Sequence, residues 1–251
     1  DIMNLTSYVD DSLLIATRLA LSERVAYLKQ QNNPEIYLKK STSILEAVTK
    51  LDIECEIIQK YTPDILPLLT ISKKIQTDLI QKHIQQLKIG YLFGKGSFSW
   101  EAVNHLRGTH ISFPTLLQLY QALDHKEVQF ALIPTHNSKI GSIHSIPDKY
   151  HLLTSFSIPI QLALYTNQPS PTYDTLYIEP HVEKEWGYHP LPPHEYKHHC
   201  SSTREGIINL LTSSQPALTI ASIHVDNPLL TRLTTLDEDN NRTYFTLVAC
   251  K

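Results

Sequence analysis

Hydrophobic positions recur with helical spacing over the first third of the chain. Between residues 4 and 31 the apolar side chains follow one helical face, and Asn32, Asn33 and Pro34 end the pattern. A second helical pattern runs from Pro34 to about residue 58, and a third covers residues 65–87. The sequence therefore predicts an all-α domain of three helices, which buries little core alone and is typical of a bundle or of a domain that pairs with a second copy.

Glycine divides the chain near residue 90. None of the first 89 residues is glycine, and all seven glycines follow. Glycine is costly inside a helix and useful at turns and where the backbone approaches a ligand. Beyond residue 88 short apolar strands alternate with helical segments. We therefore expect a helical domain at residues 1–87 and an α/β domain at residues 88–251.

Composition narrows the function classes. The 251 residues carry a net charge of −3, which gives no basic surface for nucleic acid, and no apolar run is long enough for a membrane span. Three scattered cysteines without metal-type spacing favour a reducing compartment, and charged residues interrupt the early apolar runs, so no signal peptide is expected. We expect a cytoplasmic protein; whether native residues precede Asp1 stays open.

Polar residues on the predicted helices form a set. Arg18 and Lys29 lie 11 residues apart on the first helix, and Ser72 and Gln76 lie one turn apart on the third. Over residues 5–84 this set resembles the all-helical chorismate mutases of the AroQ type. In that family an Arg and a Lys on the first helix, an Arg-Glu pair on the second and a Ser-x-x-x-Gln on the third line the pocket.

The resemblance implies that chorismate rearranges to prephenate without a proton donor or a nucleophile. Such a site holds two carboxylates in a compact conformer and donates hydrogen bonds to the breaking ether oxygen. The resemblance implies Lys29 and Gln76 as catalytic residues, and Arg18, Lys40 and Ser72 as substrate-binding residues.

This sequence departs from the mutase pattern at two places. Lys40-Ser41 stands where the family has Arg-Glu, and the arginine that the family supplies across its dimer falls near Asp1. Lys does not reproduce the bidentate grip of Arg on a carboxylate. An inactive mutase domain therefore stays an alternative.

A second set of motifs lies in residues 89–251. Gly96-Ser97-Phe98-Ser99 follows an apolar strand, and Asn137-Ser138 follows another strand and precedes Gly141. Ser201-Ser202-Thr203 opens a helix, and Thr243 begins an apolar C-terminal strand. The order and spacing of these motifs resemble the prephenate dehydratases, which are two-lobed α/β proteins like the periplasmic binding proteins.

The second resemblance implies conversion of prephenate to phenylpyruvate without a metal or another cofactor. It makes Thr243 the catalytic acid that protonates the departing hydroxyl. The substrate-binding residues that it implies are Ser97, Ser99, Asn137, Ser138, Ser202 and Thr203. It also implies one lobe from residues 89–165 with the strand 243–250, and another lobe from about 172–225.

Together the two resemblances imply a fused chorismate mutase and prephenate dehydratase of phenylalanine biosynthesis. The expected partners are a small dicarboxylate, chorismate or prephenate, and a second copy of the chain in a homodimer. The phenylalanine-binding regulatory domain that the family often carries is expected to be absent.

His136 and Tyr244 leave two other functions open. They stand where the dehydratase family has a Glu and an Arg. One alternative is a diverged enzyme that decarboxylates prephenate without making an aromatic ring. The other is a catalytically degenerate homologue that binds a ligand or a partner.

Histidines between residues 181 and 199, and Cys200 beside them, carry weaker signals. His194 and His198 have the spacing of one helical face, but Pro190, Pro192 and Pro193 break the segment, so we expect no metal. Cys200 precedes a predicted helix start, where a thiolate is favoured, but nothing else in the sequence supports a catalytic role.

Overall fold

The computed structural model describes residues 22, 25–27, 30–31, 34–40, 43–44, 46, 66–236 and 240–251, without the side chains of residues 36 and 66–69. The chain divides into two compact units. The first comprises Asp1–Leu87 with His105–Thr109, and the second comprises Lys88–Asn104 with His110–Lys251.

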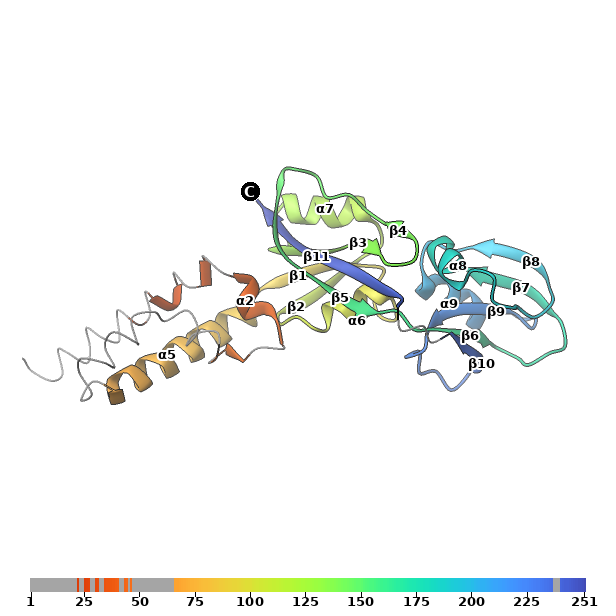
Figure 1. Ribbon diagram of the computed structural model, residues 1–251, viewed down its shortest axis with the longest axis horizontal. Coiled ribbons are helices and arrows are strands. Elements are labelled where there is room, and N and C mark those ends of the chain that lie inside the picture. Colours follow the sequence, from red (N-terminus) through yellow and green to blue (C-terminus); the bar gives the residue numbers. More distant parts are fainter. Residues whose placement is uncertain are drawn as a thin grey trace, which may run out of the picture. The chain divides into compact units, whose positions relative to one another are not determined.

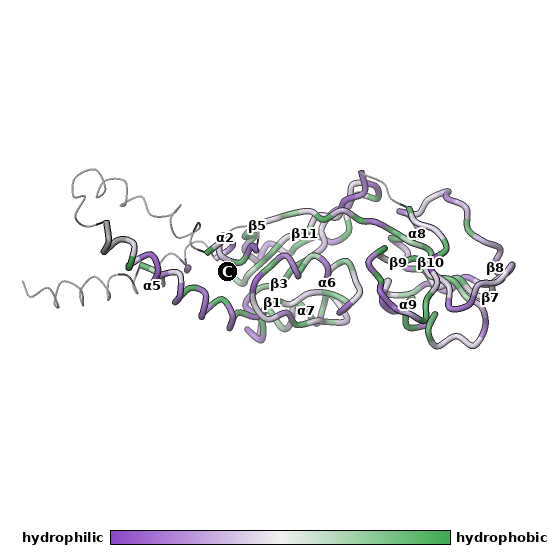
Figure 2. Tube along the Cα trace, turned by 90° about the horizontal axis from the view of Figure 1, so that it is seen from below, coloured by the Kyte–Doolittle hydropathy of each residue, from purple (hydrophilic) through white to green (hydrophobic). Residues whose placement is uncertain are grey.

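Among the described residues, the first unit contains the helices α2 (Pro34–Leu38) and α5 (Leu66–Ile84). Helix α5 corresponds to the third predicted helix, and hydrophilic and hydrophobic residues alternate along it (Figure 2). No helix in the described part of the chain is both long and apolar enough to cross a membrane.

The prediction of a continuous second helix is wrong at residue 39, where the helix is interrupted. After α2 the backbone forms a β-bridge between Lys39 and Leu106, and the Arg107 guanidinium donates to the carbonyls of Tyr37 and Lys39. A main-chain partner distant in sequence thus replaces the helical hydrogen bonds at this point. Most of the first predicted helix lies outside the described residues, so the three-helix domain as a whole is not supported.

Two β-sheets build the second unit (Figure 1). The first sheet has the order β2-β1-β3-β11-β5, with β4 paired to β3. Strand β1 is parallel to β3, and β11 runs antiparallel between β3 and β5. Its strands are β1 (Lys88–Leu92), β2 (Thr109–Phe113), β3 (Phe130–Asn137), β4 (Gly141–Ser142), β5 (Tyr150–Pro159) and β11 (Arg242–Cys250).

The second sheet has the order β10-β6-β9-β7-β8. Strand β7 is parallel to both β8 and β9, whereas β6 is antiparallel to β9 and β10. Its strands are β6 (Leu162–Thr166), β7 (Tyr173–Ile178), β8 (His194–His199), β9 (Leu218–Ser222) and β10 (Thr231–Leu236). Strands β6 and β9 are buried along their whole length, including the polar residues Thr166, Thr219 and Ser222.

Each sheet carries its own helices. Helices α6 (Phe98–Val103) and α7 (Leu116–Asp124) pack on the first sheet, and α8 (Pro180–Trp186) and α9 (Thr203–Thr212) pack on the second. Leu119 and Leu123 of α7 join Ile133 of β3 and Val248 of β11 in one core cluster. Leu210 of α9 packs with Tyr165 of β6 in another.

The chain crosses between the two sheets twice, after β5 and before β11. The Ile160 N–H donates to the Asn241 carbonyl at 2.8 Å and joins the two crossings. The predicted return of the C-terminal strand to the first sheet is confirmed by β11. The predicted end of the first lobe at residue 165 is wrong, because β6 pairs with β9 and β10.

Removing the hydroxyl of Tyr37 should stabilise the protein. Its oxygen is buried and has no hydrogen-bond partner in the described part of the chain. Because an unpaired buried hydroxyl costs desolvation energy, Tyr37→Phe should raise the free energy of unfolding by about 1 kcal/mol. Urea unfolding followed by circular dichroism measures the change.

The matched control is Tyr27→Phe, since the Tyr27 hydroxyl accepts a hydrogen bond from Gln31 at 2.7 Å on an exposed surface. This variant should not gain stability. A loss of stability in Tyr37→Phe would contradict the assignment of an unpaired hydroxyl.

Candidate functional site

A pocket of about 270 Å³ opens in the second unit. Its wall is built from the first turn of α6, strands β3 and β11 of the first sheet, helix α8 and the turn into α9. Helices α8 and α9 pack on the second sheet, so elements of both sheets contribute. The apolar part of the wall consists of Phe93, Phe98, Pro134, Ile143, Val182 and Phe245. This wall suits a ring or another flat apolar group of a ligand.

Phe93 holds a strained backbone at this wall. Its φ is 69°, in the left-handed region where bulky residues are rare. Gly94 and Gly96, with φ of 78° and 92°, complete the turn into α6. Strain of this kind persists only where the surrounding structure enforces it, and here the turn carries Phe93 and Phe98 into the pocket wall.

Hydroxyl groups at the start of α9 supply hydrogen-bond donors to the pocket. Ser202 is the N-cap, and its Oγ accepts from the Glu205 N–H at 3.1 Å. The hydroxyls of Thr203 and of Ser99, which also line the pocket, make no hydrogen bond to any described residue. Free N–H groups and the positive end of the helix dipole favour a carboxylate beside them.

A chain of buried hydrogen bonds positions Thr243. The Asn137 Nδ2 donates to Thr243 Oγ1 at 3.0 Å and to Asn241 Oδ1 at 2.8 Å. The Asn241 Nδ2 in turn donates to Glu185 Oε2 at 2.8 Å. Because Thr243 Oγ1 accepts from Asn137, the Thr243 proton is available to a ligand in the pocket.

Asn137, predicted to bind the substrate, does not line the pocket itself. Its Oδ1 accepts from the N–H groups of Lys139 and Ile140, so both ends of the amide are engaged within the protein. Asn137 is fully buried and acts on the pocket through Thr243.

Glu185 is a pocket residue that the sequence analysis missed. It lies on α8 with only 4% of its surface exposed, and burial raises its pKa from 4.5 to about 7. The carboxyl is therefore partly protonated at neutral pH. No spacing in the sequence marks it, because its partner Asn241 lies 56 positions away.

Other titratable side chains complete the wall. Glu179 caps α8 by accepting from the N–H groups of His181 and Val182, and its second oxygen lies 2.8 Å from His181 Nδ1. Burial and the neighbouring His181 lower the pKa of His144 and so favour its neutral ring. Neither Lys nor Arg is found among the described residues that line the pocket.

Two of the predicted substrate-binding serines have structural roles. Ser97 lines the pocket, but its Oγ caps α6 by accepting from Trp100 and lies 2.8 Å from the Gly94 carbonyl, to which it donates. Ser138 lies outside the pocket, where its hydroxyl bonds the Asn240 carbonyl and the Arg242 N–H. The structure thus does not bring Ser138 to this pocket, whereas Ser99, Ser202 and Thr203 line it.

His136 and Tyr244 lie away from the pocket. Their rings contact each other with centroids 5.9 Å apart, and both line a separate shallow groove. The alternation of strands β3 and β11 explains this, because neighbours of Asn137 and Thr243 point to the opposite face. His136 and Tyr244, which stand where the dehydratase pattern has a Glu and an Arg, are therefore not among the residues that line the pocket.

The predicted mutase residues are only partly brought together. Ser72 and Gln76 are buried on α5, where Gln76 donates to Ser72 at 3.1 Å and Ser72 contacts the Ser22 hydroxyl. Lys40 is exposed and lines a different groove with Gln81 and Arg107, so it does not join them. Arg18 and Lys29 lie outside the described residues.

The structure also corrects what the sequence suggested about Cys200 and about the pair His194 and His198. Burial raises the pKa of the Cys200 thiol to about 11, so it is not the thiolate that a helix start favours. His194 and His198 lie on strand β8 and not on a helix, so four residues separate them by roughly 13 Å.

Comparison with known proteins supports the fold of the second unit. No protein-family model matches the sequence, and no curated protein matches it. A solved prephenate dehydratase from Arthrobacter aurescens, in complex with L-Phe, matches with a TM-score of 0.52 and 19% identity over 66% of this chain and 61% of that one. The chain therefore has a two-sheet α/β fold of the periplasmic-binding-protein type, and spans about three fifths of that structure's length.

Two further solved structures are less similar. The quorum-quenching acylase GqqA has a TM-score of 0.43 and 16% identity over 65% of this chain and 64% of that one. The effector-binding domain of BenM with its effector benzoate has a TM-score of 0.37 and 12% identity over 65% of this chain and 83% of that one. Values this low do not indicate a shared function.

Glu185 should make the stability of the protein fall as pH rises. Its folded pKa of about 7 lies above the ordinary 4.5, so the folded chain keeps a proton that the unfolded chain has released. Between pH 5 and pH 8 the wild type should lose about 2 kcal/mol relative to Glu185→Gln. Urea unfolding at four pH values, read by tryptophan fluorescence, gives this difference.

Glu183→Gln is the matched control on the same helix. Its hydrogen bond with Lys197 is the main cause that lowers the pKa of Glu183, so its contribution to stability is lost only below pH 4.5. The pH slope of this variant from pH 5 to pH 8 should equal that of the wild type. Equal slopes for Glu185→Gln and the wild type would show that Glu185 is already ionised throughout.

Proposed function

We propose that the pocket of the second unit binds prephenate and converts it to phenylpyruvate. The observation that carries this proposal is the Thr243 hydroxyl, which lines the pocket and accepts a hydrogen bond from Asn137. A hydroxyl held in this way has its single proton free to donate. Thr243 is therefore the group that meets the leaving hydroxyl of the substrate.

The pocket has an apolar wall and a polar wall, and each binds one part of the substrate. The substrate ring lies against Phe93, Phe98 and Phe245, and a carboxylate lies at the N-terminal end of α9. The hydroxyls of Ser99 and Thr203 donate to the carboxylate or to the side-chain carbonyl of the substrate. These groups are held by secondary structure, so little reorganisation accompanies the reaction.

The reaction couples two bond cleavages. The bond between the ring and its carboxylate breaks, carbon dioxide leaves, and the released electron pair completes the aromatic ring. The ring hydroxyl leaves as water with the proton that Thr243 donates, and solvent water returns a proton to Thr243. The Thr243 hydroxyl thus protonates the leaving group in the transition state, and this step needs no metal.

The positions of His136 and Tyr244 support a dehydratase over a degenerate homologue. Both lie outside the pocket wall, so their replacement of a Glu and an Arg removes no charge from it. Two carboxyl groups line the pocket, Glu179 and Glu185. Glu179 is held by the N–H groups that it caps and by His181, and burial raises the pKa of Glu185 to about 7. A neutral Glu185 lessens the repulsion that an anion meets in the pocket.

Removing the Thr243 hydroxyl should stop the reaction. Thr243→Val should lower kcat/KM for phenylpyruvate formation by about 100-fold or more, whereas Thr243→Ser, which keeps the hydroxyl, should stay within about tenfold. Absorbance of phenylpyruvate from purified protein and prephenate measures both rates. Thr246→Val is the control, because its hydroxyl bonds Ser155 and Thr135 outside the pocket.

Equal rates for Thr243→Val and the wild type would reject the acid role. Mass spectrometry of the products separates the other functions. A dihydro product that has lost carbon dioxide and kept the hydroxyl identifies a non-aromatising decarboxylase, and unchanged prephenate removes the enzymatic proposal.

A second candidate function is ligand binding without reaction. It is favoured by the lack of Lys and Arg among the described lining residues, since a dicarboxylate is ordinarily met by at least one cation. The ligand is then a ring with one carboxylate. Calorimetry with prephenate and with phenylpyruvate distinguishes this case, in which the monocarboxylate binds more tightly and no turnover occurs.

We also propose that the chain is a fused enzyme, with chorismate mutase activity in the first unit. It is supported by the buried polar contacts of Ser22, Ser72 and Gln76, which fit a polar pocket better than an apolar helix interface. Helical spacing from Ser22 would put Arg18 and Lys29 on the same face in sequence. Pairing of two chains through this unit stays a prediction.

Substitution of Gln76 tests the proposed mutase activity. If its amide donates to the ether oxygen of chorismate, Gln76→Ala should lower the rate of chorismate consumption by about 100-fold. The exposed Gln86→Ala is the matched control and should leave the rate unchanged. No chorismate consumption above the uncatalysed rate in the wild-type protein would end the mutase proposal and leave the dehydratase proposal intact.

A further inference from the structure

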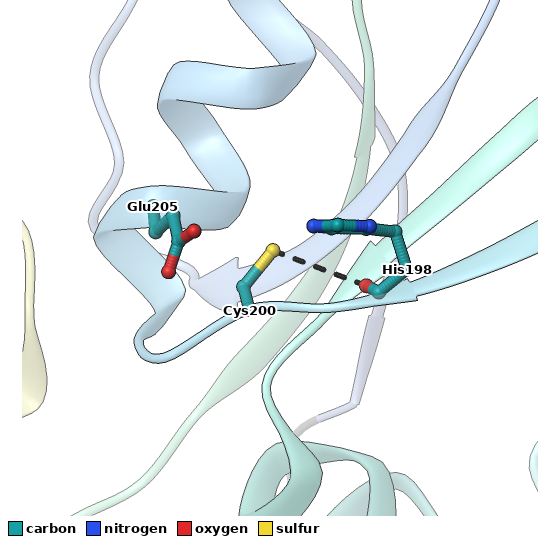
Figure 3. A group of neighbouring side chains, drawn as sticks. All are labelled: His198, Cys200 and Glu205. Carbon is teal, nitrogen blue, oxygen red and sulfur yellow. Dashed lines mark hydrogen bonds between the residues drawn. The ribbon is translucent and has the colours of Figure 1, made fainter.

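Three metal-ligating side chains meet where β8 ends and α9 begins (Figure 3). They are His198, Cys200 and Glu205, and each offers one ligand atom within 4.8 Å of the others. His198 is exposed, Cys200 is buried and Glu205 is intermediate. The group is thus reached from solvent on one side and closed by the protein on the other.

The ligand atoms of this group are largely uncommitted. The ring nitrogens of His198 form no hydrogen bond with the described residues, and the ring lies edge-on to Tyr177 at 5.8 Å. Cys200 Sγ lies 3.9 Å from the His198 carbonyl and 3.6 Å from Asn209 Nδ2, and the backbone of Ile178 also bonds the thiol. Hydrogen bonds of a neutral thiol are weak, so a metal ion is a stronger partner for this sulfur.

Glu205 has a structural role that uses one oxygen only. Its Oε2 accepts from the N–H and the hydroxyl of Ser201, a variant of the capping box at a helix start. In the described part of the chain, no hydrogen bond is made by Oε1. The cap therefore fixes the carboxylate, and one of its oxygens stays without a hydrogen bond to the described residues.

We propose that His198, Cys200 and Glu205 form a Zn²⁺ site. One thiolate, one imidazole and one carboxylate are ligands that zinc accepts, and three protein ligands with an open fourth position describe a common zinc geometry. The thiol proton passes to solvent as the zinc–sulfur bond forms. A water molecule fills the fourth position.

The geometry needs only side-chain movement. Tetrahedral zinc holds its ligand atoms roughly 3.5 Å apart. Rotation of the exposed His198 ring and of the Cys200 thiol closes the remaining distance, while the β7–β8 pairing and the Glu205 cap keep the backbone in place. Ser201 and Asn209 then serve as outer hydrogen-bond donors to the carboxylate and the sulfur.

The sequence led us to expect no metal, because only the spacing of His194 and His198 entered that expectation. His194 and His198 do not form the pair that their spacing indicates, since the His194 Nδ1 bonds the Pro192 carbonyl 3.0 Å away at the far end of β8. Cys200 and Glu205 join His198 through the turn into α9. None of the three lines the pocket of the proposed function, so the two proposals are tested independently.

Cobalt(II) and zinc titrations of the full chain test the proposal. In a Cys55→Ser/Cys250→Ser background Cys200 is the one remaining thiol. One equivalent of Co²⁺ should produce a thiolate-to-cobalt charge-transfer band, and Zn²⁺ should displace it. Adding Cys200→Ser should abolish the band and weaken Zn²⁺ binding about 100-fold, and His198→Ala or Glu205→Gln should weaken it at least tenfold.

His199→Ala is the matched control, because this neighbouring ring bonds Glu183 at 2.9 Å and not the cluster. Its Zn²⁺ affinity should equal that of the parent. X-ray absorption of the zinc complex should show one sulfur ligand, which keeps the proposal testable if a variant folds poorly. Absence of the charge-transfer band, its persistence in Cys200→Ser, or a zinc spectrum without sulfur would each overturn the site.

Discussion

The buried hydrogen-bond chain from Glu185 through Asn241 and Asn137 to Thr243 is the constraint on which the second unit depends. It joins α8 on the second sheet to β3 and β11 on the first, at the point where the chain crosses between the sheets. Each member is at most 5% exposed. Loss of one member leaves its partner unpaired in a region of low dielectric, where an unpaired polar group is costly.

This chain also decides the chemistry available in the pocket. Asn137 fixes which way the Thr243 hydroxyl donates, and Asn241 holds a Glu185 carboxyl whose pKa burial raises to about 7. A neutral carboxyl and neutral hydroxyls can meet an anion, whereas an ionised Glu185 repels it. Binding of an anionic ligand should therefore weaken as Glu185 loses its proton above pH 7.

The turn from β8 into α9 serves two separate purposes. Ser202 and Thr203 present the N-terminal end of α9 to the pocket, and Cys200 and Glu205 gather with His198 in another direction. The Glu205 cap contributes to both, because it fixes the first turn of the helix. Occupation of the zinc site would hold the same turn that positions the carboxylate-binding groups.

The sequence by itself determined the elements and the motifs that are local. Apolar runs predicted strands such as β11, and Ser97, Ser202 and Thr203 were placed at helix starts, because capping depends on residues within one turn. The order and spacing of these motifs carried the resemblance that implied the two-lobed α/β fold. Apolar periodicity alone did not determine the second predicted helix, which is interrupted at Lys39, where Leu106 offers a competing backbone partner.

Only the tertiary structure decided which side chains share a site. Asn241 meets both Asn137 and Glu185 across more than 50 positions, and Lys40 lies apart from Gln76, because distances between elements are set by packing and strand register. The pKa values of Glu185 and Cys200 follow from burial, which no spacing reveals. Asn137 and Thr243 serve the pocket, whereas their neighbours His136 and Tyr244 line a separate groove. The physical reason is that neighbouring residues of a strand face opposite sides of its sheet.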